Sequence, residues 1–151
     1  MTRPRNDESG ARARRASRRL LVQALYQHLL GGQPWQELHA QFSAERAHTR
    51  ADAVHFRAAL ESVCATGEAL DVELARHSDL PTSRLDPVEH AILRLGLWEL
   101  GSRADIPYRV VISEAVDLAK RFGATDGHRY VNAVLDHAAR SLRPLERGAV
   151  A

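Results

Sequence analysis

The chain has 151 residues and a net charge of +2 at pH 7, with 44% hydrophobic and 26% charged residues, as in an ordinary soluble domain. Its one cysteine, Cys64, excludes an intramolecular disulfide and a thiolate metal cluster. No apolar run reaches the roughly 18–20 residues that span a bilayer. We therefore expect a cytoplasmic protein with no membrane segment and a single domain over residues 11–143.

The N-terminal end of the chain is strongly basic, because seven of its first 19 residues are arginine and two are acidic. Residues 1–10 are polar and are predicted to form a disordered basic tail. A helix is predicted from about residue 11 to residue 30, before two glycines. At helical spacing, one stripe of it carries Arg12, Arg15, Arg19, Gln23 and Tyr26. A row of cations that ends in an aromatic ring favours a polyanionic partner over a merely solvated surface.

Two further helices are predicted before residue 80. Pro34 opens a short one. A longer one begins near Ala51 and continues to Leu74, with apolar residues at spacings of three and four without a break. Gly67 lies inside it and indicates a close approach by a packing neighbour. Residues 79–83 are predicted to be a connection.

The fourth predicted helix begins at Asp86 and runs to about Leu100. Asp86 is expected to cap it, Pro87 stands where no N–H is needed, and Glu89 completes a capping box. The apolar residues of this helix go nearly all the way round. Such a helix is either buried in the middle of the domain or packs against a second protein.

The last two predicted helices cover residues 108–122 and about 126–142. Gly123 is expected to end the first, and Asp126 to cap the second. Residues 144–151 are predicted to be a loose tail. Because no segment has the pattern of a strand, the chain is predicted to be an all-α compact bundle.

The sequence contains none of the common catalytic motifs: no Walker loop, dinucleotide-binding turn, nucleophile elbow or zinc-protease motif. The eight histidines are scattered, and no pair stands at ligand spacing on one helix beside a supporting carboxylate. We therefore expect no catalytic site, no metal and no cofactor.

One segment, residues 120–130, has the composition of a nucleic-acid site. Lys120 and Arg129 offer cations for phosphates, and Tyr130 offers a ring for an unpaired base. The N-terminus of the following helix adds N–H groups. Asp126 can accept a hydrogen bond from a base edge, or simply cap the helix. An ordinary helix–loop–helix corner explains the same residues equally well.

Several stretches of the sequence, in series, resemble one known family. Residues 85–100 (LDPVEHAILRLGLWEL) resemble the fourth-helix signature of the NusB family, residues 105–123 its fifth helix and residues 128–136 its sixth. The arginine-rich start, residues 14–27, is similar to the first helix of that family. The resemblance covers nearly the whole chain and is weakest over residues 33–84.

The resemblance implies a bundle of six to seven helices that binds the boxA element of ribosomal RNA leader transcripts. It also implies a partner, the small-subunit ribosomal protein called NusE in this role, and a complex that lets RNA polymerase read through terminators. The RNA-binding residues carried over are Arg12, Arg14, Arg15, Arg19, Tyr26, Lys120, Asp126, Arg129 and Tyr130. The partner-binding residues carried over, on the fourth helix, are Glu89, Ile92 and Leu93.

Two other interpretations stay open. Some RNA cytosine methyltransferases carry a NusB-like domain before a catalytic domain, although we expect 151 residues to leave no room for a cofactor-binding domain. A structural helical protein, homodimeric through the fourth helix, is the second alternative. Tyr130 departs from the family, where phenylalanine is common, and this keeps the ring while adding a hydroxyl.

Overall fold

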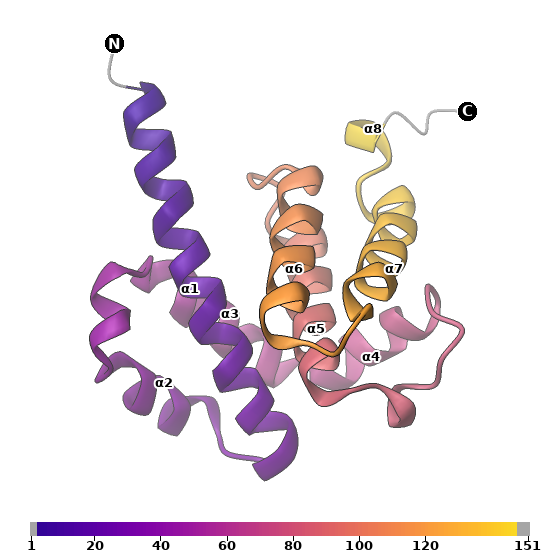
Figure 1. The fold of residues 1–151 in the computed structure, drawn as a ribbon, viewed down its shortest axis with the longest axis horizontal. Helices are drawn as coiled ribbons and strands as arrows, with labels where there is room; N and C mark the ends of the chain where they lie inside the picture. Colours follow the sequence, from indigo (N-terminus) through magenta and orange to yellow (C-terminus); the bar gives the residue numbers. More distant parts are fainter. Residues whose placement is uncertain (1–2, 148–151) are drawn as a thin grey trace. The chain divides into compact units, whose positions relative to one another are not determined.

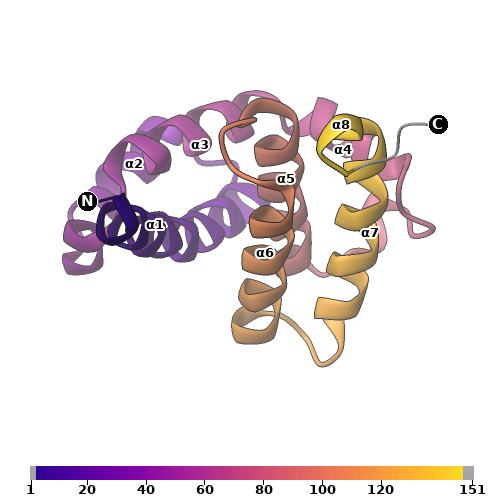
Figure 2. The ribbon, with the colours of Figure 1, turned by 90° about the horizontal axis from the view of Figure 1, so that it is seen from above.

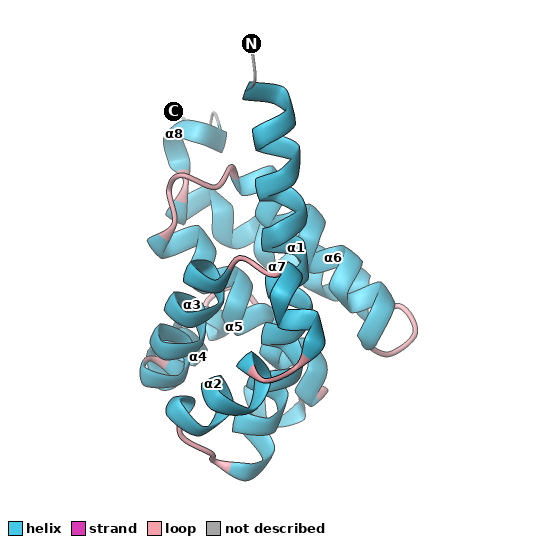
Figure 3. Ribbon diagram, turned by 90° about the vertical axis from the view of Figure 1, so that its left-hand side faces the viewer, coloured by secondary structure: helices cyan, strands magenta, loops and turns pink. Residues whose placement is uncertain are grey.

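The computed structural model describes residues 3–147, and residues 1–2 and 148–151 of the two predicted tails lie outside the described residues. Within the described part the regular elements are helices, and no strand is present (Figure 3). The predicted all-α fold is therefore confirmed. Contacts divide the chain into two compact units, residues 1–65 and residues 66–151. No helix of the described part is long and apolar enough to cross a bilayer.

The first unit is built around a long helix, α1 (Figure 1). Its described elements are α1 (Arg3–Gly31), α2 (Trp35–Ser43), the 3₁₀ helix η1 (Arg46–Arg50) and α3 (Ala53–Ala65). α1 packs against each of the others, and α2 also packs against α3. The largest side chains of the core come from α1, α2 and α3, and they are Leu21, Leu25, Leu38, Phe42, Phe56 and Leu60.

α1 begins at Arg3, well before the predicted start near residue 11. The disorder predicted for residues 3–10 is thereby corrected, since the structure has a helix there. Pro4 lies in the first turn, where the backbone N–H has no intrahelical partner in any case. Gly10 costs about 1 kcal/mol relative to alanine, which a long helix tolerates at one position.

A buried polar contact joins α1 to α3. Ser17 Oγ lies 2.7 Å from His55 Nδ1, and the two residues are 0% and 1% exposed. Asp52, just before α3, accepts a hydrogen bond from the His55 N–H (3.0 Å), and its own N–H donates to Ala13 O (2.9 Å). These directional contacts fix which face of α1 points inward, because a buried polar group must keep its partner.

The second unit is a bundle in which α5, α6 and α7 lie side by side and each packs against the other two (Figure 1 and Figure 2). α4 packs against α5, and α8 against α7. The elements are α4 (Gly67–Ala75), the 3₁₀ helix η2 (Thr82–Arg84), α5 (Pro87–Ser102), α6 (Tyr108–Phe122), α7 (Gly127–Leu142) and α8 (Pro144–Arg147).

The prediction of one long helix from Ala51 to Leu74 is wrong, because Thr66 takes a non-helical conformation between α3 and α4. The close approach predicted at Gly67 is confirmed, but the neighbour is a guanidinium: a Cβ at Gly67 would lie 2.6 Å from Arg94 Nη1. Asp71 in α4 accepts two hydrogen bonds from the same guanidinium, at 2.9 and 2.7 Å. α4 is therefore held by α5 instead of continuing α3.

α5 begins as predicted. Asp86 Oδ1 accepts hydrogen bonds from the N–H groups of Val88 (2.8 Å) and Glu89 (3.3 Å), and Pro87 is the first helical residue. The predicted capping box is wrong, because the Glu89 side chain turns toward the corner between α6 and α7. The sequence allowed this helix to be buried in the domain or to pack against a second protein, and the structure shows the first. Apart from half-buried Arg94, the residues from Ala91 to Leu100 are buried.

This burial corrects the partner surface expected on α5. Ile92 and Leu93 are 1% and 0% exposed, and Glu89 is 7% exposed. A side chain that touches a partner has to be accessible, so the structure gives Ile92 and Leu93 to the core. Packing explains why this helix is apolar on nearly every side.

An arginine from far along the chain closes the end of α5. Arg143, which is 7% exposed, donates hydrogen bonds to the carbonyl oxygens of Leu100 (2.7 Å), Glu99 (3.1 Å) and Arg103 (2.7 Å). The Glu99 and Arg103 carbonyls also accept the backbone N–H groups of Arg103 and Ile106, both at 3.0 Å, so Arg143 adds a charged donor to carbonyls at and just after the end of the helix.

α8 lies in the segment predicted to be a loose tail, and it is tied to the start of α6. Glu146 Oε2 accepts a hydrogen bond from the Tyr108 N–H (2.8 Å), and Glu146 Oε1 pairs with Arg143 (2.6 Å). Arg147 pairs with Asp136 of α7 at 3.0 Å. The described part of the predicted tail, residues 144–147, is thus attached to the bundle.

Candidate nucleic-acid interface

The outer face of α1 is a row of cations. The members of the predicted stripe Arg12, Arg15, Arg19 and Gln23 are all exposed. Gln23 Nε2 donates to the Arg19 carbonyl (3.1 Å), and Tyr26 is half-buried at the end of the row. The sequence spacing therefore identified the exposed face of this helix correctly.

Other arginines of α1 have different environments. Arg14 is half-buried, and its Nη1 would lie 3.4 Å from a Cβ at Gly10. Arg18 is 3% exposed, because it lies three and seven residues before the core residues Leu21 and Leu25. The number of arginines in α1 does not tell which of them are exposed. Their positions on the helical repeat do, because they set which side chains face the core.

In the second unit, cations gather at the corner where α6 ends and α7 begins. Lys120 and Arg121 in the last turn of α6 are exposed, with the Arg121 guanidinium 5.6 Å from the centre of the Phe122 ring. The Arg129 side chain in the first turn of α7 is 80% exposed, and its Nε lies 3.7 Å from Asp126 Oδ1. An exposed ion pair of this length is weak, so it leaves Arg129 able to bind a phosphate.

Asp126 gives the corner its shape. Its φ of 66° makes it the one non-glycine residue with positive φ in the described part of the chain. The predicted cap is corrected, because the Asp126 side chain makes no capping hydrogen bond. The Asp126 carbonyl accepts the Arg129 N–H (3.1 Å), and the Ala124 carbonyl accepts the Gly127 N–H (3.0 Å). Two of the N–H groups expected to face a phosphate are therefore used within the corner.

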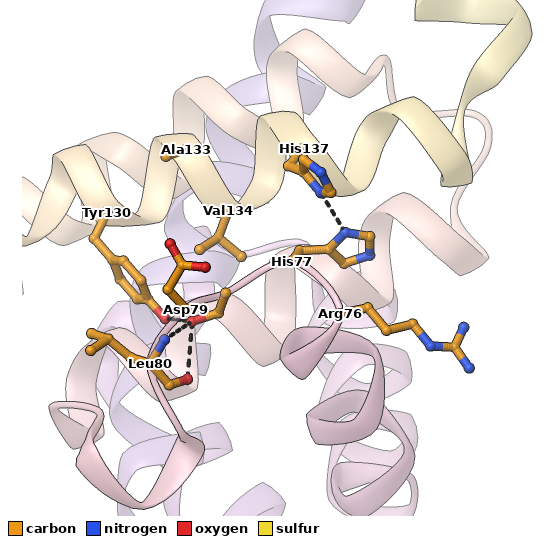
Figure 4. Close-up of a pocket in the computed structure, with 9 residues that line it drawn as sticks. Arg76, His77, Asp79, Leu80, Tyr130, Ala133, Val134 and His137 are labelled. Carbon is orange, nitrogen blue, oxygen red and sulfur yellow. Dashed lines mark hydrogen bonds between the residues drawn. The ribbon is translucent and has the colours of Figure 1, made fainter.

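Tyr130 lines a hollow of about 460 Å³ between α7 and residues 76–80. Figure 4 shows its ring running down from α7 beside Asp79 and Leu80. The Tyr130 hydroxyl is hydrogen-bonded to Ser78 Oγ, which also donates to the Leu80 carbonyl (3.1 Å). The hydroxyl that distinguishes this residue from phenylalanine thus has a partner, and the ring is half-buried.

Two histidines lie at the other end of the hollow (Figure 4). The Nδ1 atoms of His77 and His137 are 2.8 Å apart, and His77 Nε2 lies 2.6 Å from Glu73 Oε2. Because the two Nδ1 atoms face each other, one of them donates a proton that the other accepts. Sequence reasoning missed this contact, since the partners are 60 residues apart. In the described part of the chain, no group of three or more His, Cys, Asp or Glu side chains could hold a metal ion.

The residues carried over as RNA-binding fall into two groups. On α1 of the first unit lie Arg12, Arg14, Arg15, Arg19 and Tyr26; at the corner of the second unit lie Lys120, Asp126, Arg129 and Tyr130. Residues 76–80, which are outside this set, form the wall of the hollow opposite Tyr130. Nothing in the local sequence of residues 76–80 predicts that they lie opposite Tyr130.

These features define a class: an all-α protein with an exposed arginine row on its first helix and a cationic corner between two later helices. A family model described as the NusB family matches residues 15–140. The chain therefore belongs to the NusB family, which assigns it to transcription antitermination.

Individual relatives agree with this assignment. The transcription antitermination protein NusB of Paraburkholderia phymatum is 48% identical over 139 residues, which is 92% of this chain and 96% of that protein. The protein of the same name from Pseudomonas putida is 48% identical over 133 residues, covering 88% of this chain and 80% of that protein. The solved structure of T. maritima NusB is similar with a TM-score of 0.77 at 25% identity, covering 91% of this chain and 97% of that one.

Proposed function

We propose that the chain is a non-catalytic, cytoplasmic adaptor that binds the boxA element of ribosomal RNA leader transcripts. It acts together with the small-subunit ribosomal protein NusE, in the complex that lets RNA polymerase read through terminators. The observation that carries the proposal is the exposed row of Arg12, Arg15 and Arg19 on α1, in a member of a family whose relatives are transcription antitermination proteins.

The α1 row supplies affinity. Arginines at successive turns of one helix face can each neutralise a phosphate, and the counterions released make the binding strongly salt-dependent. Tyr26, half-buried at the end of the row, has an aromatic face on which a base can stack. Because the opposite face of α1 is held by the Ser17–His55 contact, the arginines stand on a helix of fixed rotation.

The corner of the second unit supplies selectivity. Lys120 and Arg129 are exposed cations for phosphates, and the Asp126 carboxylate is an acceptor for a base amino group. The Tyr130 ring lines the hollow, which suits it to an unpaired base.

The experiment that tests the proposal is a fluorescence-anisotropy titration of labelled boxA RNA with the protein, with and without the purified ribosomal protein, over a series of salt concentrations. We expect boxA RNA to bind more tightly than a scrambled RNA, more tightly again with the partner present, and less tightly as salt rises. Equal binding of boxA and scrambled RNA under every condition would overturn the proposal.

A second measurement separates the alternatives. Light scattering of the protein alone reports whether it is a homodimer, and loss of RNA binding in the dimer fraction would indicate that dimerisation masks the RNA surface. A folded protein that dimerises but binds no RNA, with or without the partner, would favour the structural interpretation.

A further inference from the structure

Glu89 lies in the first turn of α5, yet its carboxylate belongs to a different part of the unit. Glu89 Oε2 accepts a hydrogen bond from the Ala124 N–H at 3.1 Å, and the residue is 7% exposed. A glutamate three residues after an N-cap ordinarily reaches back to the cap. Here the carboxylate hydrogen-bonds to the inside of the corner between α6 and α7, where burial and the neighbouring Asp86 raise the pKa of Glu89.

Two glycines make room for this carboxylate. A Cβ at Gly123 would lie 2.7 Å from Glu89 Oε2, and a Cβ at Gly127 would lie 2.7 Å from both Glu89 Cδ and Glu89 Oε1. Real Cβ atoms do not approach this closely, so a side chain at Gly127 would displace the Glu89 carboxyl group, and one at Gly123 would also meet the Ala119 carbonyl oxygen at 2.7 Å. Gly123 has an ordinary extended φ of −90°, which shows that close approach and not backbone freedom requires glycine there.

Asp126, one of the exposed charged residues of the corner, lies between these two glycines. Asp126 is in the left-handed region, a conformation that costs free energy and persists only when its surroundings impose it. Its carbonyl accepts the Arg129 N–H, so the placement of Asp126 also sets the start of α7. The Glu89 carboxylate contacts the backbone on both sides of this strained residue.

We infer that Glu89 is a positioning residue: from inside the corner it sets the backbone of residues 123–127 and thereby aims Asp126 and Arg129 at the bound RNA. The RNA part of this inference rests on the proposed function, whereas the effect on the corner does not. Glu89 itself touches no RNA in this scheme, since its carboxylate is covered by the corner it supports.

The test compares Glu89→Ala with Glu89→Gln, which keeps the side-chain length and an acceptor oxygen. We expect Glu89→Ala to weaken binding of labelled boxA RNA about tenfold or more, and Glu89→Gln to restore affinity to within about threefold of wild type. Asp71→Asn is the matched control, because it destabilises the same unit away from the corner and should leave RNA affinity within about twofold at a temperature where it is folded. Wild-type affinity in Glu89→Ala, or an equal loss in the control, would overturn the inference.

A second readout does not need RNA. Amide hydrogen exchange at Ala124 should become at least about tenfold faster in Glu89→Ala than in Glu89→Gln, with the change confined to residues 119–130. A protein that binds no RNA but shows this local change contradicts the proposed function and keeps the positioning role. An unchanged exchange rate at Ala124 in Glu89→Ala contradicts the positioning role, whatever the RNA affinity of the variant.

A reciprocal variant approaches the same contact from the other side. Gly127→Ala places a methyl group against the Glu89 carboxyl and should weaken RNA binding about fivefold or more in the wild-type background. In the Glu89→Ala background the methyl group has room, so the same change should cost less than about twofold. Additive effects of the two substitutions would contradict a shared contact.

Discussion

The Asp71 carboxylate and the Arg94 guanidinium form a two-point pair, Nε to Oδ1 at 2.9 Å and Nη2 to Oδ2 at 2.7 Å, which ties α4 to α5. His90 Nε2 adds a third contact to Asp71 Oδ1 at 2.7 Å. The guanidinium fits against Gly67, where a Cβ would be 2.6 Å from Arg94 Nη1. The position of α4 therefore depends on one carboxylate.

We predict that Asp71→Asn lowers the free energy of unfolding by about 1.5–3 kcal/mol at neutral pH, because Arg94 and His90 lose a charged acceptor. Burial acts to raise the pKa of Asp71, but the hydrogen bonds from Arg94 and His90 outweigh it and hold the pKa below its ordinary value of 3.8. A lowered folded-state pKa gives stability that is present above the unfolded value and is lost as the pH falls through the folded one. Urea unfolding should therefore show a difference between wild type and variant that shrinks in acid. A difference that is independent of pH would contradict the role of this carboxylate.

Arg143→Met should lower the free energy of unfolding by about 2–4 kcal/mol, since three carbonyl oxygens at the end of α5 lose a charged donor. The matched control is Arg140→Met in the last turn of α7, where the arginine is exposed and the change should stay within about 0.5 kcal/mol. Thermal and urea unfolding both measure the difference. Equal effects of the two substitutions would mean that Arg143 acts through its charge and not through its hydrogen bonds.

The α1 row should determine the salt dependence of RNA binding. Replacing Arg12, Arg15 and Arg19 by glutamine should weaken affinity and reduce the slope of log K against log salt by about 0.7 for each phosphate that is no longer neutralised. The control carries three glutamines at other exposed arginines, Arg46, Arg50 and Arg140, and has the same net charge. If the slope falls equally in both triple variants, the row acts through total charge alone.

Tyr130→Phe and Tyr130→Ala separate the ring from the hydroxyl. The first removes only the hydrogen bond to Ser78, and we expect RNA affinity to stay within about twofold. The second should weaken binding by about 1–3 kcal/mol, because one base loses its stacking surface. Anisotropy titrations of both variants test this, with Ser78→Ala as the control for the hydroxyl contact. Full affinity in Tyr130→Ala would exclude stacking on this ring.

The single domain expected over residues 11–143 remains a prediction, and the two tryptophans test it. Trp35 lies in the first unit and Trp98 in the second, so Trp98→Phe and Trp35→Phe each leave one reporter. We expect the two reporters to follow the same urea midpoint, because a single domain of this length ordinarily unfolds in one cooperative transition. Separate midpoints would mean that the units fold independently.

Features of the fold that depend on neighbouring residues were predictable from the sequence. The start of α5 follows from Asp86 and Pro87, and the exposed face of α1 follows from the helical period. The break at Thr66 was not predictable from local spacing, and the pair that holds α4 beyond it joins Asp71 to Arg94, 23 residues apart.

The same distinction applies to the candidate site. The cations and rings of the corner are close together in the sequence, so the composition of residues 120–130 was enough to predict a candidate site there. The role of Glu89 was not predictable, because its partner Ala124 is 35 residues away and a local capping box satisfied the pattern equally well. The hollow beside Tyr130 was missed for the same reason, since Ser78 is 52 residues from it.

The hydrogen bonds of Arg143 have a consequence for how the chain is made. The carbonyl oxygens that it covers belong to residues 40–44 positions earlier, so the end of α5 leaves the ribosomal exit tunnel while Arg143 is still inside it. During translation this helix end therefore lacks its cap, and the second unit can close fully only after Arg143 has emerged. A nascent chain stalled with Arg143 still inside the exit tunnel should therefore be more sensitive to protease than one in which an added C-terminal linker carries Arg143 out of the tunnel.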